Sequence, residues 1–274
     1  MLTQTVPTRA PRLNETQVAQ FQREGYLLYN QPVFPTEKFE KLRAHFENKL
    51  AVLPDDFRSE AMDVPHFSDP SLFEWLFADE VLNLVEPLLG PDIALWSSHF
   101  ISKPQGDGKR VPWHEDSAYW GKVLKPMEVV TVWLAIDPST PENGCMYVIP
   151  QTHDNGYSDY DEVDAATHVF NLEIKKQQRD DSKAVPCILQ PNEASLHHAK
   201  LMHGSPPNHS RQRRCGYTMR YIPASVKFDS GYVSGRHQIY LARGRDRAGN
   251  EYADPNKSYP ELAQYRETHK TGGH

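Results

Sequence analysis

One short stretch, from Trp113 to Trp120, brings together residue types that can bind a metal ion. It reads Trp-His-Glu-Asp-Ser-Ala-Tyr-Trp and contains the only His-x-Asp of the chain, at His114 and Asp116. If the stretch is a strand, side chains two positions apart project from the same face, so the imidazole and the carboxylate converge while Glu115 points away. The pair then supplies two of the ligands that a metal ion needs.

A third ligand is expected from a later strand, within the segment that ends at Arg214. The histidines of this segment are His197, His198, His203 and His209. We favour His203, because it opens the sequence His-Gly-Ser-Pro-Pro-Asn and because Arg214 follows eleven residues later. Two histidines and one carboxylate on one side of an ion leave positions open opposite, which is the facial arrangement of non-haem Fe(II) oxygenases. An arginine such as Arg214 can hold a dicarboxylate co-substrate with a planar, two-pronged donor.

These motifs, taken with several others, resemble the phytanoyl-CoA dioxygenase family. The motifs that carry the resemblance are His114-Glu115-Asp116, Trp133 in Val-Thr-Val-Trp-Leu-Ala-Ile-Asp, Glu142-Asn143-Gly144-Cys145, Ile149-Pro150 with His153, and His203-Gly204-Ser205 followed by Arg214. The resemblance runs from about Gln17 to Pro223. Where the family commonly has Pro-Gly-Ser-His, this chain has Pro-Gln-Thr-His at 150–153, a departure in a turn that leaves the metal site intact.

The resemblance implies that the chain is a dioxygenase that uses Fe(II), 2-oxoglutarate and O2, with ascorbate as a reductant in vitro. His114, Asp116 and His203 are then the metal ligands and the catalytic residues. The residues implied for 2-oxoglutarate are Arg214 for its far carboxylate, Ser205 for a hydroxyl contact, Trp133 for a pocket wall and, more weakly, Lys103. Arg214 competes for this role with Arg213 and Arg211, which are otherwise a solvated charge run. The other three have ordinary alternatives: a turn residue before two prolines for Ser205, a core aromatic for Trp133 and a surface lysine for Lys103.

Residues beside the ligands, or alternating with positions expected to face the barrel mouth, are predicted to contact the primary substrate. They are His99, Trp113, Tyr119, Trp120, His198 and Arg220. Aromatic residues placed in this way are more often part of the core. His197, next to His198, should face away, and Arg213 should point to the opposite face from Arg214.

The expected reaction is hydroxylation of a small polar molecule, in specialised metabolism, with decarboxylation of 2-oxoglutarate to succinate. Family members that halogenate replace the carboxylate of the triad by a small residue, so the presence of Asp116 argues against halogenation. Desaturation, oxidative cyclisation, epimerisation and endoperoxide formation use the same triad and stay open. A barrel oxygenase or isomerase that uses no 2-oxoglutarate is a second interpretation. A non-catalytic jelly-roll binding module, whose histidines are structural or hold Zn²⁺, is a third.

Hydrophobic patterns predict the elements that must position these residues. Helices are expected from Asn14 to Gly25, from Thr36 through Leu50, and from Pro70 to Leu89. Strands are expected at Ile93–Phe100, Val111–His114, Val129–Ile136, Cys145–Ile149, Val185–Leu189, Ala194–His198 and Tyr217–Ile222. Many short strands with few helices between them indicate an antiparallel jelly roll, and the resemblance implies the same cupin-like double-stranded β-helix. The fold class is therefore mainly β with flanking helices.

We expect a flexible arm at residues 1–13 and a single domain at 14–274. The domain divides into a helical part (14–90), the jelly-roll core (91–226) and a C-terminal closing segment (227–274), in which 237–241 is a short helix or strand. The connection 154–184 begins with acidic and tyrosine residues and is long enough to be a lid or binding loop. Its acidity suggests a polar or cationic substrate.

Composition narrows the class of protein further. The net charge of -6 and the lack of a concentrated basic face argue against nucleic acid as a partner. Because no apolar run approaches membrane-spanning length and the N-terminus has no hydrophobic signal core, we expect a soluble, cytoplasmic monomer or homodimer with no membrane partner. The three cysteines, Cys145, Cys187 and Cys215, cannot all pair within the chain and are expected to be buried free thiols.

Overall fold

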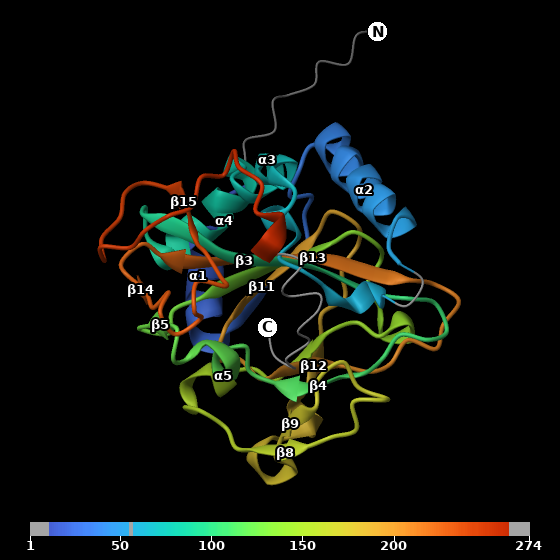
Figure 1. Ribbon diagram of the computed structural model, residues 1–274. Helices are drawn as coiled ribbons and strands as arrows, with labels where there is room; N and C mark the ends of the chain where they lie inside the picture. Colours follow the sequence, from blue (N-terminus) through green and yellow to red (C-terminus); the bar gives the residue numbers. More distant parts are fainter. Residues whose placement is uncertain (1–10, 55–56, 263–274) are drawn as a thin grey trace, which may run out of the picture.

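Two antiparallel sheets form the centre of the computed structural model, which describes residues 11–54 and 57–262 (Figure 1). Along the larger sheet the order is β1 (Tyr26–Tyr29), β11 (Ala194–His198), β6 (Val130–Ala135), β13 (Arg214–Pro223), β3 (Ile93–Lys103) and β15 (Tyr240–Arg243), with β2 (Met62–Asp63) also paired to β3. Along the smaller sheet it is β10 (Val185–Pro186), β7 (Tyr147–Val148), β12 (His203–Ser205) and β4 (Val111–His114). Two further pairs are β5 (Leu124–Lys125) with β14 (Lys227–Phe228) and β8 (Tyr160–Glu162) with β9 (Leu172–Ile174). This arrangement confirms the predicted jelly-roll fold.

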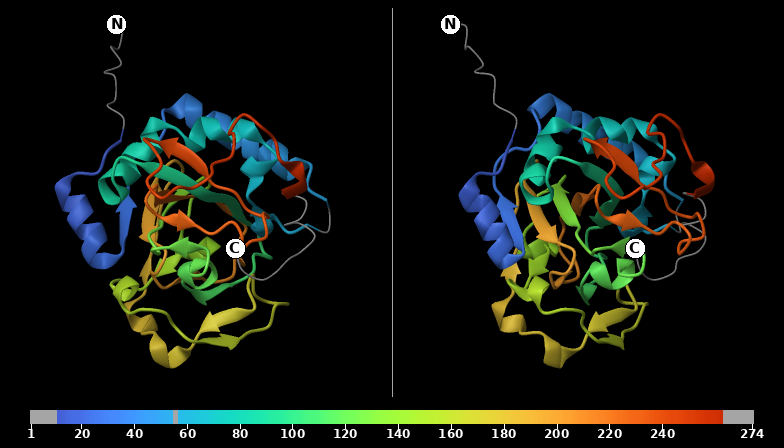
Figure 2. Two further views of the ribbon diagram at one scale, coloured as in Figure 1. Left: turned by 60° about the vertical axis from the view of Figure 1, so that its left-hand side comes forward. Right: turned by 90° about the vertical axis from the view of Figure 1, so that its left-hand side faces the viewer.

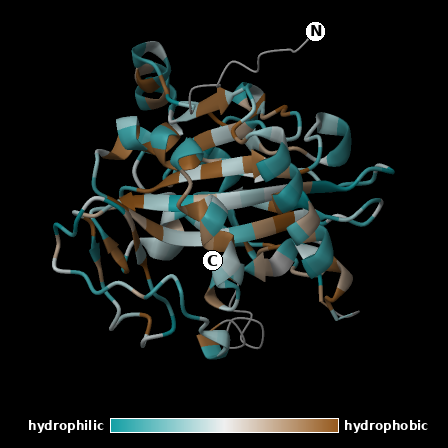
Figure 3. Ribbon diagram, turned by 90° about the horizontal axis from the view of Figure 1, so that it is seen from above, coloured by the Kyte–Doolittle hydropathy of each residue, from teal (hydrophilic) through white to brown (hydrophobic). Residues whose placement is uncertain are grey.

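Helices cover the outer face of the larger sheet (Figures 1 and 2). They are α1 (Glu15–Glu24), α2 (Thr36–Ala51), α3 (Phe73–Leu76) and α4 (Asp79–Leu89), while the short helix α5 (Ser117–Trp120) follows directly after β4. The short 3-10 helices are η1 (Ser59–Ala61), η2 (Pro65–Phe67), η3 (Pro70–Leu72), η4 (Pro141–Asn143), η5 (Thr152–Asp154), η6 (Lys176–Gln178) and η7 (Asp181–Lys183). One core cluster joins Phe46 of α2 and Leu82 of α4 to Val132 and Tyr217 of the sheet. The central strands accordingly carry much of the hydrophobic colour in Figure 3.

The first predicted helix is confirmed together with its caps. The side chain of Asn14 accepts a hydrogen bond from the backbone N–H of Gln17, whose side chain in turn accepts one from the N–H of Asn14. Gly25 ends the helix with a φ of 77°, a left-handed conformation that glycine adopts at little cost. Leu13 is already buried in the core, so the domain begins before Asn14, while residues 1–10 of the expected arm lie outside the described residues.

The single helix predicted from Pro70 to Leu89 is wrong, because the segment divides into η3, α3 and α4. Ala78 is extended, with φ -65° and ψ 137°, and the chain starts a new helix at Asp79. The hydroxyl of Tyr221 in β13 donates a 2.7 Å hydrogen bond to the carbonyl of Leu76. This bond satisfies a carbonyl group that a continuous helix would have used itself.

The strand predictions are right in kind and differ in length. Val111–His114 and Ala194–His198 match the predicted bounds, whereas β13 starts three residues earlier than expected, at Arg214. Only Tyr147–Val148 and Val185–Pro186 of their predicted runs are strand. The later strand that was expected to carry the third ligand is β12, for which no bounds were predicted.

Residues 154–184 form an ordered excursion around the hairpin β8–β9, at the end of the molecule opposite the helices (Figures 1 and 2). In the closing segment, β15 pairs with β3, so the piece predicted at 237–241 contributes to an edge strand rather than a helix. All three cysteines are buried and free, as predicted. In the described part of the chain no helix is long and apolar enough to cross a membrane.

Candidate metal centre

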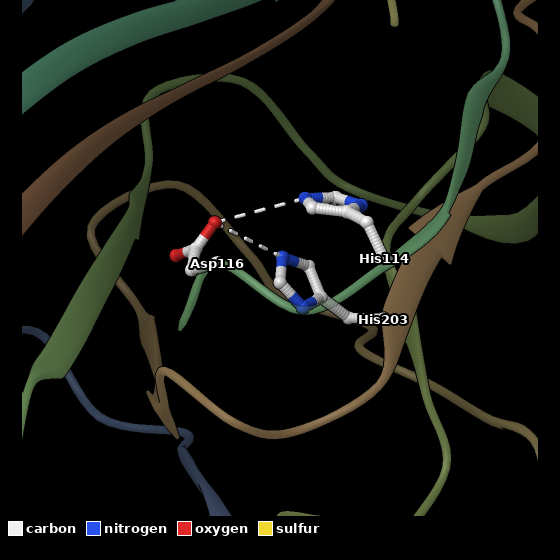
Figure 4. A group of neighbouring side chains, drawn as sticks. All are labelled: His114, Asp116 and His203. Carbon is white, nitrogen blue, oxygen red and sulfur yellow. Dashed lines mark ion pairs between the residues drawn. The ribbon is translucent and has the colours of Figure 1, made fainter. Parts of the chain in front are cut away.

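Strand pairing brings His114 and His203 together. In the smaller sheet β4 and β12 are antiparallel neighbours, and these two histidines are direct partners in the register. Each of His114, Asp116 and His203 offers a ligand atom, and these atoms all lie within 4.8 Å of one another. Figure 4 shows the three side chains pointing toward a common point. The three residues are buried.

The approach of Asp116 has a different cause from the one predicted. The strand ends at His114, and Asp116 has helical angles (φ -53°, ψ -37°) as the N-cap of α5. The carboxylate therefore returns toward His114 because the chain turns, not because side chains alternate along a strand. A 3.0 Å hydrogen bond from the N–H of Ser117 to the carbonyl of Ala199 ties this turn to the loop after β11.

Backbone carbonyl groups orient both imidazole rings. Nδ1 of His114 lies 2.8 Å from the carbonyl oxygen of Pro112, and Nδ1 of His203 lies 2.9 Å from that of Leu201. Each Nδ1 must carry the proton to make this bond, which leaves Nε2 with its lone pair free. The two Nε2 atoms lie 3.7 and 3.8 Å from Oδ1 of Asp116. Two imidazole nitrogens and one carboxylate oxygen, each free to coordinate, fit a divalent transition metal.

The electrostatics keep Asp116 and His203 in their metal-binding protonation states. Burial alone would raise the pKa of Asp116, but the charge of Arg220 and the contact with His114 outweigh it and hold that pKa well below its usual range. Burial, reinforced by His114, holds the pKa of His203 well below its usual range. An ionised carboxylate and a neutral imidazole are the forms that bind metals.

A row of side chains across the larger sheet faces the second oxygen of Asp116. His197, Thr131 and Arg220 are neighbours in the register of β11, β6 and β13. Their Nε2, Oγ1 and Nε atoms lie 3.9, 3.5 and 3.5 Å from Oδ2 of Asp116. One oxygen of the carboxylate thus faces the histidine pair, and the other faces this row.

The prediction that His198 faces the site while His197 faces away is wrong. His197 is buried and its ring centroid lies 4.8 Å from that of His203. His198 lies on the other face of β11, 5.7 Å from the ring of His153. The inward face of the strand follows from its pairing with β1 and β6, which the local sequence does not reveal.

Arg214, Ser205 and Trp133 lie together beside the histidine pair. Nη2 of Arg214 donates a 3.3 Å hydrogen bond to Oγ of Ser205, and its guanidinium carbon lies 5.3 Å from the ring centroid of Trp133. Arg214 is only 2% exposed, its Nε has no hydrogen-bond partner in the described part of the chain, and burial lowers its pKa to about 10. Trp133 packs on Gly216, where a Cβ atom would stand 2.1 Å from Cζ2 of the indole. Glycine is therefore required at this position.

Lys103 is neither a surface lysine nor a residue that lines the hollow, the two positions considered for it. The side chain is fully buried. Its Nζ donates to the backbone carbonyl groups of Ser205 and Pro206. Burial, followed by the charge of Arg214, holds its pKa well below the usual range. Lys103 thus supports the turn that carries Ser205.

The metal ligands and Arg214 share one hollow, with an empty volume of about 520 Å³ counted to its open mouth. Its lining residues are Glu60, His99, Ile101, Val111, His114, Asp116, Trp133, Met146, Val169, Phe170, His197, His203, Gly204, Ser205, Arg214, Thr218 and Arg220. Two of the residues predicted to face the substrate, His99 and Arg220, are among them. Thr218 and Ile101 were missed, although period-two alternation from Arg214 and His99 indicates both.

Trp113, Tyr119 and Trp120 were also predicted to face the substrate, but they do not line this hollow. Trp113 alternates with His114 on β4 and packs in a separate cluster with Ile149. Trp120 is buried against Trp96, with ring centroids 5.9 Å apart. Trp113 and Trp120 therefore contribute mainly to packing, whereas Tyr119 lies beside the site, with its ring centroid 6.4 Å from that of His114.

The segment that carries β8 and β9 closes one side of the hollow. Phe170 packs edge-on against His114, with ring centroids 5.0 Å apart. The backbone N–H of Glu115 donates to the hydroxyl of Tyr160, and the hydroxyl of Ser158 donates to the carboxylate of Glu115. No local sequence pattern indicates that Phe170 lines the site, because its position depends on how the hairpin β8–β9 folds back on β4.

The acidic side chains at the start of this segment do not support the predicted polar or cationic substrate. Asp154, Asp159, Asp161, Glu162 and Asp164 are exposed, and none lines the hollow.

Comparison with known proteins is consistent with this geometry. A family model described as phytanoyl-CoA dioxygenase (PhyH) matches residues 21–216. The peroxisomal phytanoyl-CoA dioxygenase of Bos taurus is 26% identical over 166 residues, which cover 58% of this chain and 48% of that protein. This chain therefore spans about half the length of that relative.

Two solved structures are similar in fold. A non-haem monooxygenase, ThoJ in its apo form, has a TM-score of 0.71 at 23% identity, over 92% of this chain and 93% of the other. CytC3, solved with Fe(II) and α-ketoglutarate, has a TM-score of 0.63 at 24% identity, over 88% of this chain and 94% of the other.

Proposed function

Because the chain belongs to the phytanoyl-CoA dioxygenase family, we propose that it is a non-haem Fe(II)- and 2-oxoglutarate-dependent dioxygenase that hydroxylates a small molecule. One observation carries the proposal. The same hollow contains a group of two histidines and one carboxylate and, beside it, a buried arginine that no described carboxylate neutralises. The first arrangement suits a facially bound metal ion, and the second suits an anionic co-substrate.

His114, Asp116 and His203 would hold the metal ion. When bound, Fe(II) and 2-oxoglutarate supply the oxidising chemistry with O2 and release succinate and carbon dioxide. The chain contributes ligands that need no rearrangement, because backbone carbonyl groups already fix both imidazole rings.

Arg214 would anchor the far carboxylate of 2-oxoglutarate with the help of the Ser205 hydroxyl, and Trp133 would form the wall beside it. Burial strengthens the attraction, since a buried guanidinium lacks competing water. The apolar side chains of Val111, Met146 and Phe170 would limit the access of water to the metal.

The test is succinate formation from 2-oxoglutarate under air with added Fe(II) and ascorbate. We expect slow uncoupled turnover by the wild type and none by His203→Ala or Asp116→Ala. His198→Ala is the matched control, because this histidine lies on the opposite face of β11, and it should retain the wild-type rate.

Absence of succinate in the wild type would contradict the proposal if 2-oxoglutarate also failed to bind the metal-loaded protein without oxygen. A non-catalytic binding module would then explain the site better. Oxygen uptake without 2-oxoglutarate would instead indicate an oxygenase of the same barrel shape that needs no co-substrate. Once a substrate is found, product analysis separates hydroxylation from desaturation, cyclisation and epimerisation, which use the same ligands.

A further inference from the structure

A second buried arginine lines the hollow, on the other side of Asp116. Arg220 lies six residues after Arg214 on β13 and is 2% exposed. Its guanidinium carbon lies 5.4 Å from the ring centroid of Trp120, and its Nε lies 3.5 Å from Oδ2 of Asp116. Neither Nε nor Nη1 has a hydrogen-bond partner among the described residues. A buried guanidinium normally makes such bonds, so Nε and Nη1 can donate hydrogen bonds to a ligand that enters the hollow.

The Cα atoms of Arg214 and Arg220 lie about 20 Å apart, because six residues of extended strand separate them. Arg214 contacts Ser205 and Trp133, whereas Arg220 contacts Asp116 and Trp120, so the two side chains lie in different parts of the hollow.

Two acids and two arginines line the hollow in the described part of the chain: Asp116 and Glu60, Arg214 and Arg220. Glu60 is bonded to Arg58, whose Nη2 and Nε lie 2.7 and 3.1 Å from its two oxygens and whose Nη1 lies 3.0 Å from Asp107. Asp116 is therefore the lining acid beside Arg220, at an ion-pair distance that makes no hydrogen bond.

A buried guanidinium with unsatisfied N–H groups is costly, and an anion that enters the hollow and accepts hydrogen bonds from Arg220 relieves that cost.

We propose that Arg220 binds an anionic group of the primary substrate, a carboxylate or a phosphoryl-type oxyanion. This inference rests on the proposed function, because it concerns the substrate of the same site. The lining of the hollow also includes the apolar side chains of Ile101, Val169 and Phe170. The substrate class that fits is a small acid with an apolar body.

Calorimetric titration tests the inference without requiring turnover. Anaerobic protein loaded with Fe(II) and saturated with 2-oxoglutarate, which blocks Arg214, is titrated with benzoate, with phenylphosphonate and, as a neutral match, with benzamide. We expect one or both anions to bind and benzamide not to bind. Benzoate binding alone indicates a carboxylate substrate, and phenylphosphonate binding alone indicates a phosphoryl-type one.

Substitutions assign the binding to Arg220. Arg220→Gln should weaken it by about tenfold or more, the size expected for loss of a charge-assisted hydrogen bond. Arg220→Lys should weaken it less and guards against a folding defect. Arg213→Gln, which changes an arginine outside the hollow, should leave it unchanged. The affinity for 2-oxoglutarate should change by less than about twofold in all three variants. Because Arg220 lies beside the ligand Asp116, Arg220→Gln should also weaken Fe(II) binding, but less than it weakens anion binding.

Three results would overturn the inference. In the first, neither anion binds the 2-oxoglutarate-saturated wild type. In the second, benzamide binds as well as benzoate, or Arg213→Gln loses as much binding as Arg220→Gln. In the third, Arg220→Gln weakens Fe(II) or 2-oxoglutarate binding as much as anion binding, which would make Arg220 only a positioning residue for Asp116 or a co-substrate contact.

Failure of the proposed function is recognised separately, as failure of 2-oxoglutarate to bind the metal-loaded wild type. Benzoate is then titrated into Arg214→Gln without 2-oxoglutarate. If benzoate binds Arg214→Gln but not the double variant Arg214→Gln/Arg220→Gln, the anion position at Arg220 is supported independently of the proposed function. If benzoate does not bind Arg214→Gln, the inference is overturned.

Discussion

Arg213 and Arg214 are adjacent residues with opposite surroundings. Arg213 makes paired hydrogen bonds to the carboxylates of Glu47 and Asp137, and these bonds raise its pKa. Arg214 faces the hollow, where its side chain contacts the Ser205 hydroxyl and the Trp133 ring. The first arginine is thus suited to hold α2 against the sheet, and the second to receive a ligand.

We predict that Arg214→Gln raises the KM for 2-oxoglutarate about 10- to 100-fold, since a charge-assisted hydrogen bond contributes about 1.5–3 kcal/mol. Succinate assays at varied 2-oxoglutarate concentration measure this, and the affinity for Fe(II) should not change. Arg213→Gln should leave the KM unchanged and instead lower the free energy of unfolding by about 1–3 kcal/mol. Equal effects of the two substitutions on the KM would contradict the assignment.

The segment with β8 and β9 is the element that separates the metal ligands from solvent on one side. Phe170 covers the ring of His114, and Glu115 is bonded to the segment through both its backbone N–H and its carboxylate. An element anchored directly next to two metal ligands should affect how readily the metal leaves.

We therefore predict that Phe170→Ala speeds the loss of bound Fe(II) to a chelator by about tenfold, a typical size for groups that support metal ligands. Stopped-flow mixing with a coloured chelator measures the rate. Tyr157→Ala, a change at a residue of the same segment that is 60% exposed, should have little effect. An unchanged rate in Phe170→Ala would show that the segment does not protect the metal.

Asp69 joins helix α2 to the turn η3. One of its oxygens lies 2.8 Å from both Nε2 of His45 and Nζ of Lys49, and the other accepts from the backbone N–H and hydroxyl of Ser71. Burial alone would raise the pKa of Asp69, but these bonds outweigh it and hold the pKa well below its usual range. The ionised form is therefore favoured by folding.

A group with a depressed pKa in the folded state stabilises the fold above its ordinary pKa, about 3.9 for Asp, and this stabilisation is lost as the pH falls below that value. We predict that Asp69→Asn lowers the free energy of unfolding by about 1–3 kcal/mol at pH 7 and that the difference from wild type shrinks below about pH 4. Urea unfolding at several pH values measures it, with Asp161→Asn, an exposed residue, as the control. A difference independent of pH would mean that the charge is not the cause.

At the scale of the whole molecule, the candidate site ties distant parts of the chain together. His114 and His203 come from separate strands of the smaller sheet, and Arg214 comes from the larger sheet. A metal ion and 2-oxoglutarate would connect both sheets in the folded state and would have no such site in the unfolded chain.

Binding that is confined to the folded state stabilises it by mass action, by about 2.7 kcal/mol at a ligand concentration of 100 Kd. For a chain of this size we predict that saturating Ni²⁺ and 2-oxoglutarate raise Tm by about 5–10 °C, measured by differential scanning calorimetry. His203→Ala should lose most of this increase, and His198→Ala should keep it. An equal increase in both variants would place the metal elsewhere.

The sequence by itself determined the features that depend on near neighbours in the chain. The sequence predicted the caps of α1 and the bounds of β4 and β11, because each depends on a few adjacent residues. It also gave the spacing from His203 to Arg214 directly. The fold class followed from the number and shortness of the strands, and the family followed from the order of the motifs.

Only the tertiary structure decided which side chains meet. The turn of Asp116 into α5, the inward face of His197, the burial of Lys103 and the cover by Phe170 each depend on where a strand ends or on which strand it pairs with. Hydrogen-bond ladders between segments far apart in sequence set these features. A shift of one residue in such a ladder would exchange the two faces of a strand, and nothing in the local sequence of the strand records which register the folded chain adopts.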